Sequence, residues 1–269
     1  QIDRCRTTTM GVRGDERQIA KNDGIEWFST IVSVAESPVD GGVIWAGTDD
    51  GNLQVSRDTG RTFSEVAQHL PGLPRGNEYW IAGVDASHFD AGTAYVAVDG
   101  HRSDDMHPHV FVTNDYGMTF ARITNGLPAF GNVRVVREDP RNSALLFAGT
   151  EFGVFASMDG GAHWVRFMNG LPTVRTDDML VHPRDADLIV ATHGRSVWIA
   201  DDISALEQFT PEVAARDAYL FQPREAVAWV NDLSNASPAY GDRTFSGENA
   251  PPGPAISYYL RSAVPGDVR

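Results

Sequence analysis

The sequence is poor in cysteine, in basic residues and in long apolar runs. Cys5 is the only cysteine among 269 residues, which excludes an internal disulfide and any zinc site built from several cysteines. No apolar run approaches the roughly 18 residues that a membrane-spanning helix needs, so we expect no membrane span. Lys and Arg total 22 against 36 Asp and Glu, and the formal net charge of −14 disfavours nucleic acid and anionic lipid as partners.

The sequence also lacks the short motifs of several enzyme classes. It contains no Gly-x-Ser-x-Gly elbow, no His-Glu-x-x-His pair, no phosphate-binding loop and no dinucleotide fingerprint. Acyl transfer, zinc proteolysis and nucleotide chemistry therefore have no support. Helical periodicity is nearly absent. From Ile25 onward, short β-branched or aromatic runs alternate with Gly, Pro, Asn and Asp, which is typical of many antiparallel strands.

The most prominent feature that the sequence does contain is an octet that occurs three times. It reads SRDTGRTF at 56–63, TNDYGMTF at 113–120 and SMDGGAHW at 157–164. We expect the shared Asp to accept hydrogen bonds from turn amides, the Gly to supply a positive φ, and the final aromatic ring to be buried beneath the turn. The predicted structural residues are Asp58, Gly60, Phe63, Asp115, Gly117, Phe120, Asp159, Gly161 and Trp164.

The residues around the third octet form the clearest repeat. Runs that fit β-strands occupy 133–138, 145–149, 153–158 and 164–167. Four antiparallel strands in about 40 to 45 residues match one blade of a β-propeller. The same spacing predicts further blades that begin near residues 31, 80 and 179. The last of these lacks the octet, and we expect its outer strand at 218–221 or 226–230.

These patterns predict an all-β fold and a division of the chain. The fold is a β-propeller of four-stranded antiparallel blades, with about four blades in this chain as part of a larger ring, followed by the start of a β-sandwich domain. A self-contained four-bladed ring is the alternative. Because no signal peptide precedes Gln1, we expect that an upstream segment has been removed. The expected parts are an irregular lead-in at 1–24, blades at 25–230, a linker at 231–254 and the first strand of a truncated β-sandwich at 255–269.

Acidic residues gather in the turns between the second and third strands, at the end of each blade opposite the octets, where propellers usually bind ligands. They are Asp49, Asp50, Asp104, Asp105 and Glu151. Glycoside hydrolysis requires two carboxylates about 5 to 10 Å apart, which makes Asp50, Asp105 and Glu151 catalytic candidates. The alternative interpretation is that each acid satisfies the amides of its own turn.

Basic and aromatic side chains accompany these acids. The predicted ligand-binding residues are Asp49, Tyr79, His101, Arg102, Asp104, Phe152, His193 and Arg195. For His193 and Arg195, a role in function and an internal Arg to Asp pair remain equally open. Trp80 and Trp198 lie inside strand patterns and are expected in the core, while Trp27 is a further candidate for stacking on a sugar.

Three histidines in one loop raise the question of a metal. His101, His107 and His109 lie near Asp104 and Asp105, and imidazole with carboxylate can hold a divalent cation. Their spacing matches no known ligand motif, so a stiff exposed loop is the favoured interpretation. We therefore expect no cofactor and predict no metal ligands, with a cation at the 99–109 loop as the less favoured alternative.

The octet resembles the Asp-box, or BNR repeat, of β-propellers. With the stretches GTDDGNLQVSRDTGRTF, DGHRSDD, GTEFGVFASMDGG and ATHGRSVWIADDIS, the chain is similar to large secreted bacterial proteins of the sortilin-like, BNR-repeat group, often labelled glycosyl hydrolases. This resemblance implies a propeller followed by a small β-sandwich, an extracellular or periplasmic location, a polysaccharide or protein ligand, and remaining blades on the same polypeptide. It transfers no catalytic residues, because the aspartate motifs of xyloglucan-cleaving relatives are missing here.

Two functions remain open at this point. The first is a binding propeller that recognises a glycan or a protein through the end opposite the octets. The second is a glycoside hydrolase that uses Asp50, Asp105 or Glu151. A third and weaker possibility is an assembly factor for a larger complex.

Overall fold

The computed structural model describes residues 8–9, 12–13, 30–73, 79–226 and 253–263. Strands and turns make up nearly all of these residues, as the predicted all-β fold requires. The predictions for Trp27, for most of the 1–24 lead-in and for most of the 231–254 linker lie outside the described residues. Among the residues described, no helix has the length and apolar character that crossing a membrane demands.

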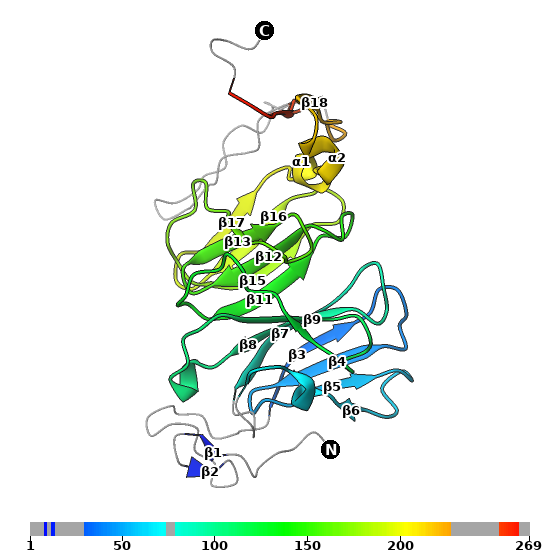
Figure 1. Ribbon diagram of the computed structural model, residues 1–269, viewed down its shortest axis with the longest axis vertical. Coiled ribbons are helices and arrows are strands. Elements are labelled where there is room, and N and C mark those ends of the chain that lie inside the picture. The colour runs from blue at the N-terminus through cyan, green and yellow to red at the C-terminus, as the bar shows by residue number, and fades with distance from the viewer. Residues whose placement is uncertain (1–7, 10–11, 14–29, 74–78, 227–252, 264–269) are drawn as a thin grey trace, which may run out of the picture.

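Four antiparallel sheets follow one another along the chain, and we call them blades 1 to 4 (Figure 1). Blade 1 contains β3 (Ile31–Glu36), β4 (Ile44–Thr48), β5 (Leu53–Ser56) and β6 (Ser64–Glu65). Blade 2 contains β7 (Trp80–Ala86), β8 (Ala94–Asp99), β9 (His109–Thr113) and β10 (Ala121–Arg122). Blade 3 contains β11 (Val133–Glu138), β12 (Leu146–Thr150), β13 (Gly153–Ser157) and β14 (Val165–Arg166). Blade 4 contains β15 (Thr176–Val181), β16 (Leu188–Thr192) and β17 (Val197–Ala200).

The remaining elements are short. They are β1 (Thr8–Thr9), β2 (Val12–Arg13), the 3-10 turns η2 (Ala67–His69) and η3 (His101–Ser103), α1 (Ser204–Glu207), α2 (Pro211–Ala214), β18 (Ala218–Leu220) and β19 (Tyr258–Leu260). The expectation that 218–221 supplies the outer strand of blade 4 is wrong, because β18 pairs with β19. Blade 4 has three strands within the described part of the chain, and residues 227–230 lie outside it.

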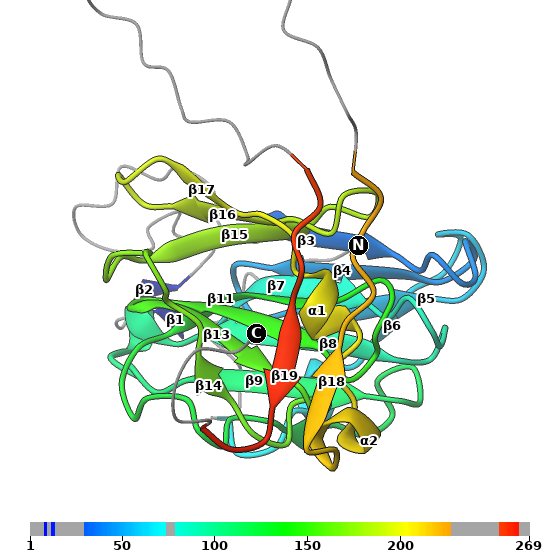
Figure 2. The ribbon, with the colours of Figure 1, turned by 90° about the horizontal axis from the view of Figure 1, so that it is seen from above.

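The blades stack through their first strands. β3 lies beside β7, β7 beside β11, and β11 beside β15, so the sheets rise in chain order from blade 1 to blade 4 (Figure 1). Seen from above, the sheets overlie one another (Figure 2). Small residues on the second strands make this approach possible. A Cβ added at Gly47 would overlap the Ile81 side chain of the next blade, and one added at Gly149 would lie 2.7 Å from Thr176 Cγ2.

The hydrophobic core lies between neighbouring blades. One cluster of buried side chains joins blades 1 and 2 around Trp45, Ile81 and Phe111. A second joins blades 2 and 3, and a third joins blades 3 and 4 around Phe147 and Leu188. Because every interface needs two sheets, each blade is stabilised by its neighbours rather than by a core of its own.

The three octets fold into the same turn. Each Asp carboxylate accepts a backbone N–H four residues on, at 2.9 Å for Asp58, 2.9 Å for Asp115 and 2.8 Å for Asp159. The opening Ser or Thr hydroxyl accepts the amide of the octet glycine at 2.9 Å in all three turns. Gly60, Gly117 and Gly161 have φ of 80°, 81° and 90°. The residue before each of these glycines also has positive φ, a feature that the sequence pattern did not indicate.

The octet aromatics differ in burial. Trp164 is 3% exposed and donates its indole N–H to the Ile123 carbonyl of blade 2 at 2.8 Å. Phe120 is half-buried against the cluster shared with blade 1. The expectation of a buried ring is wrong for Phe63, which is 39% exposed. The octet aromatic packs on the preceding blade, and the described residues include no blade before blade 1.

The outer faces of the first and last blades are open. Val34 in β3 is 64% exposed, whereas the matching residues Val84 and Val136 are 3% and 0% exposed. Ile199 at the other end, in β17, is also exposed. The four blades therefore form an open arc of a propeller and not the closed four-bladed ring that was the alternative.

Candidate binding rim between blades 2 and 3

Hydrogen bonds show that the two kinds of turn lie at opposite ends of the blades. At one end, the octet amides of Thr59, Tyr116 and Gly160 donate to the turns between the first and second strands, at 3.0, 2.9 and 2.9 Å. At the other end, the amides of Asp49, Glu151 and His193 donate to carbonyls just before the first strand of their own blades. Those acceptors are Thr30, Asn132 and Arg175, at 3.1, 3.0 and 2.9 Å. We call this second end the rim.

The longest rim turn follows β8 and is organised by Asp105. Its carboxylate accepts hydrogen bonds from the Tyr79 hydroxyl at 2.8 Å, from His109 Nε2 at 2.9 Å, and from both the amide and Nδ1 of His107 at 3.0 and 2.7 Å. Burial acts to raise the pKa of Asp105, but these hydrogen bonds hold it well below its usual range. Asp105 is therefore an ionised structural acceptor.

The neighbours of Asp105 are fixed by the same contacts. Burial and the adjacent carboxylate raise the pKa of Tyr79 to about 12, so the phenol keeps its proton. His109 is buried, and its Nδ1 lies 3.0 Å from Arg122 Nη1. Because a guanidinium only donates, Nδ1 accepts and Nε2 carries the proton that goes to Asp105. Both ring nitrogens of His109 are thus occupied.

His107 differs from His109 because its ring is on the surface. Its side chain is 64% exposed, and its Nδ1 bond to Asp105 leaves Nε2 with no partner among the described residues. The ring stacks on Phe130, with centroids 5.7 Å apart and planes 28° apart. Asp105 therefore holds an exposed imidazole in one orientation.

Two exposed phenylalanines extend this surface toward blade 3. Phe130 is 63% exposed and Phe152 is 44% exposed. Gly131 joins them, because its backbone lies so close to the Phe152 ring that an added Cβ would be 2.8 Å from Cδ2. The Gly131 amide donates to the Met106 carbonyl at 2.8 Å, which ties this segment to the blade 2 turn.

Asn132 completes the connection between the turns of blades 2 and 3. Its side-chain amide donates to the Asp105 carbonyl at 3.0 Å, and its own carbonyl accepts the Glu151 amide at 3.0 Å. The structure thus brings the Asp105 and Glu151 turns together. We use the term rim site for the group formed by His107, Phe130, Glu151 and Phe152. Asp105 and Asn132 hold this group in place.

The acids of blade 1 are engaged within their own blade. The Asp50 side chain is fully buried and accepts hydrogen bonds from the Thr48 hydroxyl and, at 3.0 Å, from the Asn52 amide group. Asp49 accepts the Thr30 amide at 2.8 Å. These contacts match the alternative interpretation, in which the acid satisfies its own turn. The geometry therefore weighs against Asp50 as a catalytic acid or base.

His101 and Arg102 are engaged around Trp80. His101 Nδ1 lies 2.8 Å from the buried Asp99 carboxylate, which also pairs with Arg134 Nη1 at 2.7 Å. The guanidinium groups of Arg102 and Arg134 lie 4.7 and 5.2 Å from the centre of the Trp80 ring. His101 and Arg102 are therefore held by contacts within blades 2 and 3. Asp104, in contrast, is exposed and adopts a left-handed conformation with φ 59°.

The blade 4 turn forms a separate ionic group. His193 Nδ1 lies 2.6 Å from Arg175 Nη2 and 3.1 Å from Asp177 Oδ2, and Arg175 pairs with Asp177 at 2.7 Å. Arg195 is exposed, and its carbonyl accepts the Trp198 indole N–H at 2.9 Å. The expectation that Trp198 is core is wrong, because β17 is the edge strand of its blade and the ring is 39% exposed.

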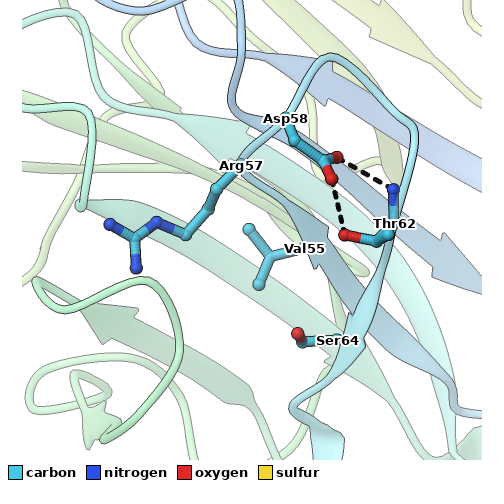
Figure 3. Close-up of a pocket in the computed structure, with 5 residues that line it drawn as sticks. All are labelled: Val55, Arg57, Asp58, Thr62 and Ser64. Carbon is cyan, nitrogen blue, oxygen red and sulfur yellow. Dashed lines mark hydrogen bonds between the residues drawn. The ribbon is translucent and has the colours of Figure 1, made fainter.

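A shallow pocket lies at the octet end of the blades, beside the first octet turn. Val55, Arg57, Asp58, Thr62 and Ser64 line it (Figure 3). Hydrogen bonds from Thr62 lower the pKa of Asp58 to about 2, and Arg57 lies 3.9 Å from the centre of the Tyr116 ring in the next octet. The side chains of Asp58 and Arg57 are therefore already engaged in contacts that hold the octet turns. Among the described residues, no group of three or more His, Cys, Asp or Glu side chains is placed to hold a metal ion.

Sequence reasoning missed Phe130, Asn132 and Arg134, and it treated His107 only as a metal candidate. The signal for Phe130 was weak: an aromatic residue between Pro128 and Gly131, in a segment with no strand alternation. Its partner Phe152 lies in another blade. Their proximity depends on how blades 2 and 3 stack.

Comparisons with known proteins agree with the fold that the sheets define. No family model matches the chain, and neither does any curated protein. Several solved structures match the chain. A GH74 enzyme of Niastella koreensis is 15% identical with a TM-score of 0.50, over 68% of this chain and 30% of that one. The GH74 xyloglucanase of Xanthomonas campestris is 19% identical with a TM-score of 0.49, over 72% and 32%. YCF48 of Cyanidioschyzon merolae is 17% identical with a TM-score of 0.47, over 62% and 52%.

The molecule is of the β-propeller class, which its own sheets define and which these neighbours share. The chain spans about a third to a half of the length of the three structures. At 15% identity and a TM-score of 0.50, the likeness to the Niastella koreensis enzyme supports the fold alone and carries no activity to this chain.

Proposed function

We propose that this chain is a propeller segment that binds a glycan through the rim site. The observation that carries the proposal is the continuous exposed strip of His107, Phe130 and Phe152. Exposed aromatic faces at the rim suit the apolar C–H faces of sugar rings. Single exposed aromatics are ordinary, but two rings joined by one glycine and flanked by an oriented imidazole form a surface.

Polar groups beside the strip fit the hydroxyl groups of a sugar. Because His107 Nδ1 is bonded to Asp105, Nε2 is the ring nitrogen left to form a hydrogen bond with a sugar hydroxyl. Glu151 adds a carboxylate next to Phe152. The imidazole and the carboxylate thus place polar groups beside an apolar surface, and polar groups of this kind fix the orientation of a bound ligand.

Hydrolysis is the second candidate, and the contacts weigh against it. A glycosidase needs one carboxyl group that keeps its proton as well as a second, ionised one. Both oxygens of Asp105 are already acceptors and its pKa is lowered, while Asp50 is buried in its own turn. Glu151 is the remaining acid of the three, so a hydrolase would need a partner carboxylate from elsewhere.

The class and the setting of the protein are part of the same proposal. The octet sequence and its hydrogen bonds support an Asp-box propeller of the BNR type, similar to sortilin-like bacterial proteins. That resemblance leads us to propose an extracytoplasmic location and a larger ring whose remaining blades lie on the same polypeptide.

Binding measurements on matched phenylalanine variants test the proposal. The probes are soluble β-glucans and xyloglucan, measured by isothermal titration calorimetry with Phe130→Ala, Phe152→Ala and the control Phe89→Ala. Phe89 is 46% exposed but follows β7, at the octet end. We expect each rim variant to weaken binding on the order of tenfold and the control to bind as wild type. Equal losses in all three variants would contradict the proposal.

The same samples separate the alternatives. Release of reducing sugar by wild type that disappears in Glu151→Gln would support the hydrolase. Binding to peptides with no binding to any polysaccharide would instead indicate a protein ligand at the same strip.

A further inference from the structure

Buried hydrogen-bond donors without acceptors gather around Trp80, the first residue of β7. The described residues contain seven buried side-chain nitrogen or oxygen atoms that have no hydrogen-bond partner there. Four of the seven lie on Trp80 and on the two segments beside it, namely Trp80 Nε1, Arg102 Nη1, Ser103 Oγ and Arg134 Nε. Each of these atoms can donate, and an unpaired buried donor is costly to a fold. We call these four side chains the donor cluster.

Contacts hold the donor cluster in place between blades 2 and 3. The guanidinium groups of Arg102 and Arg134 lie 4.7 and 5.2 Å from the centre of the Trp80 ring. Ser103 follows Arg102 in η3, and its amide donates to the Gly100 carbonyl at 2.8 Å. Arg134 comes from β11 of the next blade. The donors therefore come together only where the two blades meet.

The donor cluster carries one positive charge that no described acid balances. Asp99 is fully buried and pairs with Arg134 Nη1 at 2.7 Å. Burial acts to raise the pKa of Asp99, but hydrogen bonds from His101 and the charge of Arg134 hold it below its usual range. Asp99 is thus ionised and balances Arg134. Arg102 forms no ion pair with a described carboxylate, and its charge is left for an anion.

The donor cluster and the rim site lie on the same turn. The Gly100 carbonyl accepts the amide of Ser103 on one side and that of Asp105 on the other, at 2.8 and 3.1 Å. Tyr79, which donates to the Asp105 carboxylate, is the neighbour of Trp80 in the chain. A ligand that lies on the rim site is therefore close to the donor cluster.

We propose that the donor cluster binds an acidic substituent of a glycan, a singly charged carboxylate or sulfate ester. This inference rests on the proposed function and narrows it to acidic glycans. One negative charge balances Arg102, and the oxygen atoms of the substituent accept the unpaired hydrogen bonds. Arg102 is partly exposed and its side chain makes no hydrogen bond to a described residue, so it can turn outward to admit the group. A neutral sugar leaves the donors unpaired and should bind less tightly.

Isothermal titration calorimetry with matched oligosaccharides at low ionic strength tests the inference. One pair is an oligogalacturonide and its neutral, carboxyl-reduced form, and the other is a sulfated oligogalactan and its desulfated form. Wild type should bind the acidic member of at least one pair about tenfold more tightly than the neutral member, and that pair identifies the acidic group. The formal net charge of −14 repels anions and cannot produce this preference. Equal affinities within both pairs would overturn the inference.

Variants locate the preference. Arg102→Gln should bind acidic and neutral forms alike. Arg57→Gln is the matched control, because Arg57 also lies on an aromatic ring, that of Tyr116, but at the octet end, and its loss changes the net charge equally. Trp80→Phe keeps a ring and removes one donor, so it should reduce the preference several-fold. A preference that survives Arg102→Gln, or that Arg57→Gln removes equally, would overturn the inference. Circular dichroism checks the folding of each variant.

Failure of the inference differs from failure of the proposed function. If Phe130→Ala weakens binding of acidic and neutral forms while wild type does not distinguish them, the rim site stands and the inference fails. If no oligosaccharide binds, sodium sulfate and sodium acetate replace the glycans, with sodium chloride at equal ionic strength as control. The readout is the indole N–H signal of Trp80 in nitrogen-15 NMR, assigned with Trp80→Phe. A saturable shift that Arg102→Gln abolishes would keep the anion site and contradict the glycan, and no shift would overturn the inference.

Discussion

At the octet end of the blades, Asp58, Asp115 and Asp159 make the same hydrogen bonds to the same positions in three successive sheets. At the rim, the matching positions hold Asp49, Glu151 and His193, and the side chains of Asp49 and His193 contact different kinds of partner. Both ends are polar, and each repeats one backbone hydrogen bond in three of the four blades. The side chains that the turns present to solvent vary more at the rim than at the octet end.

The difference separates structural polarity from polarity that can serve a ligand. A carboxylate whose acceptor positions are filled by its own turn contributes to folding, and repetition of that arrangement indicates a structural role. The blade 2 rim turn is longer, and it holds the exposed imidazole of His107 in one orientation beside the exposed rings of Phe130 and Phe152. These side chains are available to contact a ligand. The octets therefore hold the arc, and the blade 2 and 3 rim is where a ligand fits best.

The largest expected effect tests whether the octets are equivalent in energy as well as in geometry. Trp164→Ala should lower the free energy of unfolding by about 3 to 5 kcal/mol, because the ring is buried against blade 2. Phe63→Ala, at the same octet position, should cost less than about 1 kcal/mol, because its ring is half-exposed. Urea denaturation at concentrations where the chain is monomeric measures both. Equal costs would mean that the turn, and not the preceding blade, determines the role of the aromatic.

A second prediction compares a buried acid near the octets with an exposed one at the rim. Burial, together with nearby Glu207, raises the pKa of Asp139 to about 6, and its Oδ2 has no hydrogen-bond partner among the described residues. The native state therefore binds this proton more tightly than the unfolded state does. Stability from this group is complete below 3.8, the ordinary pKa of an aspartate, and is lost as pH rises through about 6.

Asp139→Asn should remove that loss. The variant keeps the Oδ1 acceptor for the amides of Arg141 and Asn142, so at pH 7 it should gain on the order of 1 to 3 kcal/mol relative to wild type, with little change near pH 4. Urea denaturation across this pH range measures the slope, and Asp104→Asn at the exposed rim is the control. If the free energy of unfolding of Asp139→Asn depended on pH as that of wild type does, ionisation of Asp139 in the folded protein would not reduce stability.

The sequence was sufficient to predict the fold but not the candidate site. The reason is that the two depend on contacts over different distances along the chain. Octets and strand alternation act within one blade, so Asp115 and Gly117 could be assigned from eight residues. The rim site depends on contacts between distant segments. Asp105 is held by Tyr79, which is 26 residues away, and Phe130 meets Phe152 only because blades 2 and 3 stack. A list of acidic turn residues could not show that Asp50 is buried while Phe130 is exposed.

The smallest expected effect concerns the one octet whose sequence departs from the other two. Where the first two turns close with the hydroxyls of Thr62 and Thr119, both 2.6 Å from the Asp carboxylate, the third uses His163 Nδ1 at 2.7 Å. If these donors are interchangeable, His163→Thr should leave the free energy of unfolding within about 0.5 kcal/mol of wild type at neutral pH. His163→Val, which has a similar shape to Thr but no donor, is the matched control and should be less stable than His163→Thr. A large loss in His163→Thr would instead give the third turn a role that the other two lack, and the contrast between a repetitive end and a variable end would no longer hold.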